Sequence, residues 1–325
     1  MGSGLIIGVD GGGTRTVAVA AQADGTLVGC AIGPGVNYNH NIGMEGAREN
    51  LRKTVDALLV RCGAQDFDRL LLGLSALDQD ADSETVRSFA GNCFDPAKLR
   101  IHSDAYVALI GATLGQPGTL MVCGTGSILL QLDAQGQQHV CLGWGTLLGD
   151  PGSAYTLALE GLQAAIAAWE QIGPETALTA ATERYFSLSA PRELIDRIYD
   201  EGMAPDQIAQ FARPVLAAAE QGDTVALGIL HDNMRRLGAK CAQAIGEHPD
   251  TVRVILHGGV FQHSPQARAL FVEELSAHKP DAWIAPSAYP PAIGAVLCHF
   301  LEKGSLDASV RDRIQASKGV YHEGL

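Results

Sequence analysis

Two glycine-rich turns, each flanked by strand-like segments, are the parts of this sequence best suited to chemistry. They consist of Gly11, Gly12, Gly13 and Thr14, and of Gly124, Thr125 and Gly126. Glycines let backbone N–H groups approach a phosphate without a Cβ in the way, and the two threonines add hydroxyl donors. Each turn alone would also fit an ordinary hairpin, but their matching places in the chain favour phosphate binding. Neither has the P-loop spacing or the Gly-x-Gly-x-x-Gly pattern of dinucleotide folds.

Two carboxylates stand beside predicted strand ends. Asp10 precedes the first turn, where it can hold Mg²⁺ through water or cap its own turn. Asp104 follows an apolar strand at 99–102 and opens a helix, which makes it a candidate general base. A helix N-cap at Ser103 or Asp104 is the competing interpretation. A second copy of this segment carries Ser287 at the matching position, which can cap a helix but cannot act as a carboxylate base, so we favour catalysis for Asp104.

A further glycine-dense stretch, 143–155, is a candidate substrate-binding segment. Asp150 followed by Pro151 is also typical of an N-cap with proline at the first helical position. Asn37 lies in a predicted loop, where an asparagine can simply hold a turn. The ten histidines show no metal-ligand spacing, and the seven scattered cysteines form no Cys-x-x-Cys pair, which disfavours structural zinc and a redox motif.

The glycine turns need strands that end where the turns begin, and the sequence predicts them twice. Apolar segments 5–9 and 16–20 flank the first turn, and 119–122 and 128–132 flank the second, about 113 residues later. Such a repeated plan indicates a duplicated fold.

A second internal match supports duplication. Residues 101–114 and 284–297 are identical at seven of fourteen positions, and each copy reads as a strand, a turn and a helix packed closely through small residues. In both halves antiparallel strands come first and strand–helix units follow. This order predicts an α/β fold with mixed sheets flanked by helices.

A breaker cluster, Gly115-Gln116-Pro117-Gly118, predicts the boundary between two domains, 1–115 and 116–325. The second domain would carry a helical insertion at about 152–245. A short terminal helix at about 307–318 could pack back on the first domain.

Composition narrows the class of protein. A chain of 325 residues with 46% hydrophobic residues can bury two sizeable cores, and a net charge of −13 makes a nucleic acid an unlikely partner. No apolar stretch reaches about 20 residues, so we expect no membrane span. The unpaired cysteines favour a reducing cytoplasm.

Taken in order, these motifs resemble the N-acetylglucosamine/glucosamine kinases of the BadF/BadG/BcrA/BcrD ATPase family, within the actin–Hsp70–sugar kinase superfamily. The motifs that carry the resemblance are Asp10 to Thr14, Asn37, Ser103-Asp104-Ala105, Gly124 to Ser127, and 143–155. The resemblance is specific over 5–160 and continues weakly through His257-Gly258-Gly259-Val260. It implies a duplicated ribonuclease H-like (actin-like ATPase) fold, with an active-site cleft between two lobes.

The resemblance also implies roles for individual residues. The two glycine turns would hold the phosphates of ATP, Asp10 would organise Mg²⁺, and Gly258 and Gly259 would lie near the adenosine. The residues that would bind the amino sugar are Asn37, Asp104, Gly143, Gly145 and Asp150. Asp104 would accept the proton of the sugar 6-hydroxyl as it attacks the γ-phosphorus. Pro151 departs from the family, whose members often have an acidic residue there, and this leaves the sugar preference open.

Two other functions fit parts of this pattern. An ATPase that activates an iron–sulfur dehydratase or reductase shares the ATP-binding plan, but it needs converging cysteines that this sequence does not supply. A non-catalytic sugar- or nucleotide-binding regulator would need a DNA-binding arm or basic patch, and neither is visible. The family resemblance makes a homodimer plausible.

Overall fold

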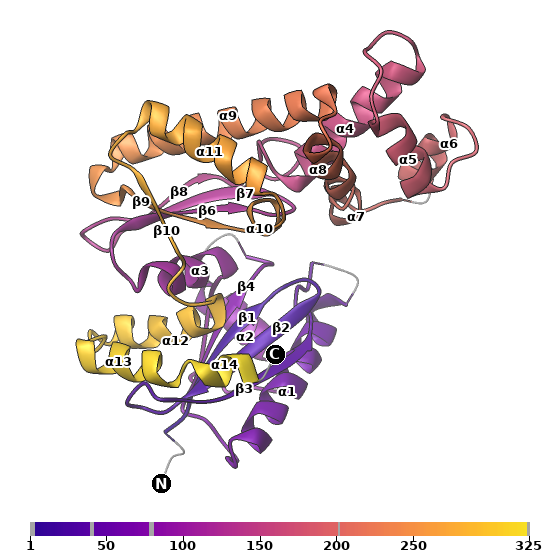
Figure 1. Cartoon of the computed structure of the whole chain (residues 1–325). Coiled ribbons are helices and arrows are strands. Elements are labelled where there is room, and N and C mark those ends of the chain that lie inside the picture. The colour runs from indigo at the N-terminus through magenta and orange to yellow at the C-terminus, as the bar shows by residue number, and fades with distance from the viewer. Residues whose placement is uncertain (1–3, 40–41, 78–80, 201, 324–325) are drawn as a thin grey trace. The chain divides into compact units, whose positions relative to one another are not determined.

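A computed structural model of the protein describes residues 4–39, 42–77, 81–200 and 202–323 (Figure 1). The chain forms two compact units. Unit 1 comprises Met1–Gln116 and Pro286–Leu325, and unit 2 comprises Pro117–Ala285. The first limit lies beside the predicted boundary. The prediction differs at the second limit, since it placed 286–306 in the second domain, whereas this segment packs in unit 1.

Unit 1 is built on a five-stranded mixed sheet of order β3-β2-β1-β4-β5. Its strands are β1 (Ile6–Gly11), β2 (Arg15–Ala21), β3 (Leu27–Pro34), β4 (Arg69–Leu74) and β5 (Leu99–Ser103). β2 runs antiparallel to both β1 and β3, while β1, β4 and β5 are parallel. The carboxyl ends of these three parallel strands therefore meet at one edge of the sheet.

Helices flank this sheet, and most of them have buried apolar residues. They are α1 (Gly43–Arg61), α2 (Ser83–Ala90), α3 (Asp104–Thr113), α12 (Pro291–Glu302), α13 (Ala308–Ser317) and α14 (Gly319–Glu323). In α1 the buried residues include Ala47, Leu51, Val55 and Leu58, at the spacing of one helical face. α12 lies so close to β1 that a Cβ on Gly8 would be 2.4 Å from the Ala292 carbonyl oxygen.

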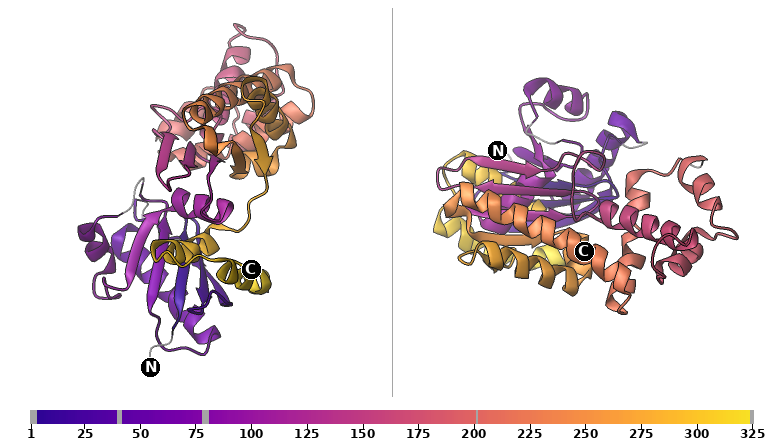
Figure 2. Two further views of the ribbon diagram at one scale, coloured as in Figure 1. Left: turned by 90° about the vertical axis from the view of Figure 1, so that its left-hand side faces the viewer. Right: turned by 90° about the horizontal axis from the view of Figure 1, so that it is seen from above.

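The predicted terminal helix is α13, and together with α14 it packs against β3 (Figures 1 and 2). The backbone N–H of Leu27 donates to Ser317 Oγ (2.9 Å). Arg313 Nη1 donates to the Asp24 carbonyl oxygen (3.2 Å), so α13 also holds the turn between β2 and β3.

Unit 2 repeats the sheet of unit 1. Its strands are β6 (Gly118–Cys123), β7 (Ser127–Leu132), β8 (Gln138–Leu142), β9 (Arg253–His257) and β10 (Trp283–Ala285). The strand order is β10-β9-β6-β7-β8, with β6 antiparallel to β7 and parallel to β9. Three antiparallel strands and two parallel additions thus occur in the same order in both units, so the predicted duplicated α/β fold is confirmed.

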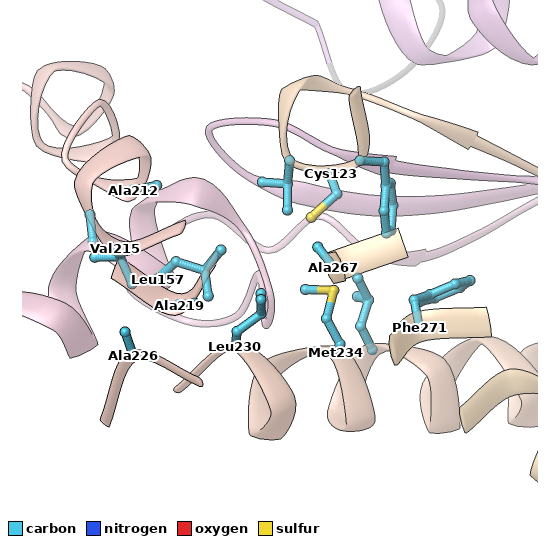
Figure 3. Close-up of a cluster of buried hydrophobic side chains, with 14 of the residues drawn as sticks. Cys123, Leu157, Ala212, Val215, Ala219, Ala226, Leu230, Met234, Ala267 and Phe271 are labelled. Atoms are coloured by element: carbon cyan, nitrogen blue, oxygen red, sulfur yellow. The ribbon is translucent and has the colours of Figure 1, made fainter. Parts of the chain in front are cut away.

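The helical part of unit 2 covers the predicted insertion and packs around one apolar core. Its helices are α4 (Ala154–Trp169), α5 (Leu178–Phe186), α6 (Glu193–Ile195), α7 (Pro205–Ala209), α8 (Ala212–Glu220), α9 (Thr224–Glu247), α10 (Gly259–His263) and α11 (Pro265–His278), with a π-helical turn at Asp196–Asp200 and a 3₁₀ turn at Pro249–Thr251. Figure 3 shows Leu157 of α4 and Met234 of α9 in this core, near Cys123 at the end of β6. Among the described residues, no helix is long and apolar enough to cross a membrane.

Candidate active site

Asp10 and Asp104 both lie at the edge of unit 1 where the parallel strands end. Asp10 is the penultimate residue of β1, and Asp104 begins α3 directly after β5. The N-cap of α3 is Ser103, whose Oγ accepts from the Tyr106 N–H (3.1 Å). Asp104 Oδ1 accepts from the adjacent Ala105 N–H (2.7 Å). Ser103, and not Asp104, is therefore the N-cap of α3.

The two carboxylates influence each other. Burial, followed by the negative charge of Asp104, raises the pKa of Asp10 from 3.8 to about 6, while the guanidinium of Arg15 opposes this shift. Two carboxylates at close quarters favour binding of a proton or a cation.

Asp10→Asn is expected to raise the free energy of unfolding by about 2–3 kcal/mol at about pH 7.5, because a pKa shift of one unit corresponds to about 1.4 kcal/mol. The folded state holds the Asp10 proton more tightly than the unfolded chain does, so ionised Asp10 destabilises the fold above its folded pKa of about 6. This gain in the free energy of unfolding should fall to less than half as the pH decreases to about 4.5, towards the pKa that Asp10 has in the unfolded chain. Urea unfolding without magnesium at both pH values measures this. A gain that does not vary with pH would contradict the assignment.

The surroundings of Asp10 fit a magnesium ion held by few protein ligands. Magnesium prefers oxygen ligands and usually keeps several waters, so one carboxylate can suffice. Asp104 adds negative charge nearby. Within the described ranges, no group of three or more His, Cys, Asp or Glu side chains is placed to hold a metal ion.

The first glycine turn joins β1 to β2 and is braced from one side. The Gly12 N–H donates to the Arg15 carbonyl oxygen (3.1 Å), and the Gly12 carbonyl accepts from the Val36 N–H (3.0 Å). A Cβ on Gly35 would lie 2.1 Å from the Gly13 carbonyl oxygen, so the turn and the following loop touch through their backbones. Gly13 and Thr14 remain exposed, where a ligand can reach them.

Asn37 both holds a turn and reaches the strand ends. Its Oδ1 accepts from the Asn39 N–H (3.0 Å), and its Nδ2 donates to Ser75 Oγ (3.1 Å). Ser75 follows β4, and its N–H donates to the Gly11 carbonyl oxygen (3.1 Å). Our sequence reasoning missed Ser75. Its position directly after a parallel strand, like that of Asp104, is the signal that could have identified it.

The second glycine turn joins β6 to β7 and rests on the beginning of α4. The Ala154 N–H donates to the Gly124 carbonyl oxygen (2.8 Å), and the Tyr155 N–H donates to that of Thr125 (3.2 Å). The turn therefore uses two N–H groups that a helix start leaves without intrahelical partners. Thr125 itself is exposed.

Asp150 does not cap α4, so that interpretation of Asp150 and Pro151 is wrong. The N-cap is Ser153, whose Oγ accepts from the Thr156 N–H (3.1 Å). Asp150 precedes the helix in a left-handed conformation (φ +60°), and Pro151 is not the first helical residue. The Pro151 carbonyl instead accepts from Ser127 Oγ (2.9 Å), which fixes this segment beneath β7.

The Asp150 carboxylate is buried against the second glycine turn. Its side chain lies so close that a Cβ on Gly126 would be 2.5 Å from Asp150 Oδ2. Burial raises the pKa of Asp150, and N–H groups of Ser127 and of residues 143–145 oppose the rise. Asp150 Oδ1 is buried without a hydrogen-bond partner among the described residues, so it has capacity to accept one more donor.

The loop from Gly143 to Gly149, which precedes Asp150, is open to solvent. Gly143 and Gly145 have φ values of +72° and +82°, which glycine adopts without strain. The side chains of this loop that are both large and apolar are exposed: Trp144, Leu147 and Leu148. Gly143 and Gly145 are themselves exposed, so their backbone groups are accessible.

Gly258 and Gly259 connect β9 to α10 beside the end of β6. Gly258 has a φ of +98°, and a Cβ on it would be 2.4 Å from the Cys123 carbonyl oxygen. This close approach requires glycine. In unit 2 the structure thus collects the second glycine turn, the 143–150 segment and the 258–259 turn around the ends of β6 and β9. In unit 1 it collects Asp10, the first glycine turn, Asn37 and Asp104.

Comparisons with known proteins identify the family of this chain. The chain belongs to the BadF/BadG/BcrA/BcrD ATPase family, whose model matches residues 7–298. It is 28% identical over 313 residues to the N-acetyl-D-glucosamine kinase of Dictyostelium discoideum, covering 91% of this chain and 98% of that protein. It is 30% identical over 231 residues to the glucosamine kinase GspK of Vibrio cholerae, covering 69% and 74%. A solved structure from Chromobacterium violaceum superposes with a TM-score of 0.72 at 27% identity, covering 90% of this chain and 98% of that one. The predicted family is confirmed.

Proposed function

We propose that this protein is an ATP-dependent sugar kinase that phosphorylates an amino sugar, N-acetylglucosamine or glucosamine, at its 6-hydroxyl. The observation that carries the proposal is the similarity to an N-acetyl-D-glucosamine kinase over nearly the whole of both chains. A carboxylate that is not used as the N-cap, Asp104, supports it from the structure, since an alcohol acceptor needs a group to take its proton.

Each unit contributes to nucleotide binding in this proposal. The exposed Thr14 and Thr125, with the glycines of their turns, would donate hydrogen bonds to the phosphates of ATP. Asp10 would hold Mg²⁺ through water, and the ion would neutralise charge on the phosphates. The turn formed by Gly258 and Gly259 would lie near the adenosine, as the family resemblance implies.

Asp104 would act as the general base. Phosphoryl transfer depends mainly on positioning and on charge neutralisation, so the protein needs one well-placed proton acceptor rather than a covalent intermediate. Asp104 would accept the proton of the sugar 6-hydroxyl as that oxygen bonds to the γ-phosphorus and ADP leaves. Asn37, Gly143, Gly145 and Asp150 would bind the sugar, with Asp150 Oδ1 available for a hydroxyl or amide donor.

A coupled assay of ADP release with Mg·ATP tests the function across glucosamine, N-acetylglucosamine, N-acetylmuramate and plain hexoses. We expect turnover with N-acetylglucosamine or glucosamine, and ³¹P NMR should identify a 6-phosphate. ADP release that does not depend on sugar, or that occurs only with plain hexoses, would contradict the proposal.

We also propose a cytoplasmic homodimer, and sedimentation of the purified protein tests the oligomeric state.

A further inference from the structure

A buried asparagine in the helical insertion contacts the segment that carries Asp150. Asn233 of α9 has no exposed surface, and its side chain makes hydrogen bonds at both ends. Its Oδ1 accepts from the Gly152 N–H (3.0 Å), and its Nδ2 donates to Glu160 Oε2 of α4 and to the Ile229 carbonyl oxygen. Burying an amide is costly unless it is hydrogen-bonded, so these contacts account for a polar group in an apolar core.

Gly152 is fixed on both sides of its backbone. While its N–H is bound by Asn233, its carbonyl accepts from Cys123 Sγ at the end of β6 (2.9 Å). Its φ is +74°, and a Cβ there would lie 3.1 Å from Met234 Cε and 3.2 Å from Leu237 Cδ2. Met234 points into the core shown in Figure 3, so α9 gives Gly152 a rigid support.

The segment around Gly152 links Asp150, a candidate sugar-binding residue, to the second glycine turn, a candidate phosphate-binding site. Asp150 lies two residues before Gly152, and Ser153, which caps α4, directly follows it. The first N–H groups of α4 bind the carbonyls of Gly124 and Thr125. A displacement of Gly152 would therefore move Asp150 first and the start of α4 with it.

Glu160 determines which end of the Asn233 amide faces Gly152. A carboxylate only accepts hydrogen bonds, so the Asn233 Nδ2 group must point to Glu160 and Oδ1 must point to the Gly152 N–H. Arg236 Nη2 lies 3.3 Å from Glu160 Oε1 and keeps that carboxylate in place.

We infer that Asn233, oriented by Glu160, is a positioning residue that holds the 150–153 segment in the conformation that binds the sugar. This inference rests on the proposed function. Asn233 belongs to none of the motifs that identify the site. The hydrogen bonds of its side chain go to Gly152, Glu160 and Ile229, and not to the exposed loop 143–149. Its effect on the sugar would be transmitted through the Gly152 backbone.

Asn233→Leu tests the inference, because leucine has a similar size and forms none of the three side-chain hydrogen bonds of Asn233. We expect the KM for the amino sugar to rise at least tenfold, while the KM for ATP changes less than twofold. Hydrogen exchange at the Gly152 N–H should accelerate in the folded protein. The double variant Asn233→Asp with Glu160→Gln should recover part of the sugar affinity. In that variant the carboxylate introduced on α9 can accept from the Gly152 N–H, and the amide introduced on α4 can donate to the same carboxylate. Recovery should be partial, because a carboxylate cannot donate to the Ile229 carbonyl as Asn233 Nδ2 does.

Thr182→Val is the matched control, because Thr182 is equally buried in unit 2 and its hydroxyl donates to the Leu178 carbonyl of its own helix. It should leave both KM values unchanged even if it lowers thermal stability. If the wild type is active and Asn233→Leu leaves the sugar KM unchanged, the inference is overturned. It is also overturned if the KM values for sugar and for ATP rise equally. A wild type that phosphorylates no amino sugar instead refutes the proposed function, which the wild-type assay alone decides.

Discussion

Asp104→Asn should lower kcat for the amino sugar about 10²–10⁴-fold, the range for loss of a general base. The asparagine oxygen can still accept the Ala105 N–H that Asp104 Oδ1 accepts, but it cannot take a proton from the sugar hydroxyl. Sugar binding should largely survive, since only the proton transfer is lost. The measurements are steady-state ADP release for kcat and calorimetry for binding of the sugar.

The fold should tolerate this substitution because Ser103, not Asp104, caps α3. Asp82→Asn is the matched control: Asp82 caps α2 in the same unit, and its Oδ1 accepts from the Thr85 N–H (2.8 Å). That variant should retain full turnover. Asp104→Asn with turnover close to that of the wild type would refute the role of Asp104 as the base.

Local patterns were enough to predict the two sheets and the position of the glycine turns. Apolar runs on both sides of a glycine cluster can hardly form anything but a hairpin, and the same pattern occurred twice. The match between 101–114 and 284–297 likewise predicted the strand–turn–helix units that the structure contains as β5 with α3 and β10 with α12.

The details that depend on geometry between distant segments could not be predicted in the same way. Ser75 directly follows a predicted strand, but its contact with the first glycine turn depends on β4 lying beside β1 in the sheet. Asp150 with Pro151 has the composition of a helix start, but the bond from Ser127 Oγ to the Pro151 carbonyl holds that segment outside the helix. Tertiary contacts of this kind override local preference.

The domain limits illustrate the same point on a larger scale. β10 pairs with β9 in unit 2, whereas α12, which follows it, packs on β1 and α3 of unit 1. The sequence of α12 is apolar on nearly all sides and therefore demands burial, but it carries no signal for which sheet will bury it. The contact with α3 makes that choice specific.

Gly294→Ala should destabilise the protein by about 3 kcal/mol or more, at the upper end of the cost of overpacking a core. Gly294 of α12 crosses Gly111 of α3, and a Cβ at 294 would lie 2.0 Å from the Val107 carbonyl oxygen and 2.9 Å from the Gly111 Cα. These are backbone atoms, so no side chain can turn aside, and the two helices must separate. The urea midpoint from far-ultraviolet circular dichroism measures the loss. Tryptophan fluorescence is less suitable, because Trp144, Trp169 and Trp283 all lie in unit 2.

Gly228→Ala is the matched control within a helix. Among the described residues, no atom beyond the adjoining stretch of α9 lies within 4 Å of the Cβ position of Gly228. Alanine there should stabilise the protein by about 0.5–1 kcal/mol through helix propensity alone. Because α3 begins with Asp104, separation of α3 from α12 in Gly294→Ala should also lower kcat at temperatures where the variant remains folded. A Gly294→Ala protein with the wild-type midpoint and full turnover would show that the two helices do not need this close contact, and that the position of Asp104 depends on β5 alone.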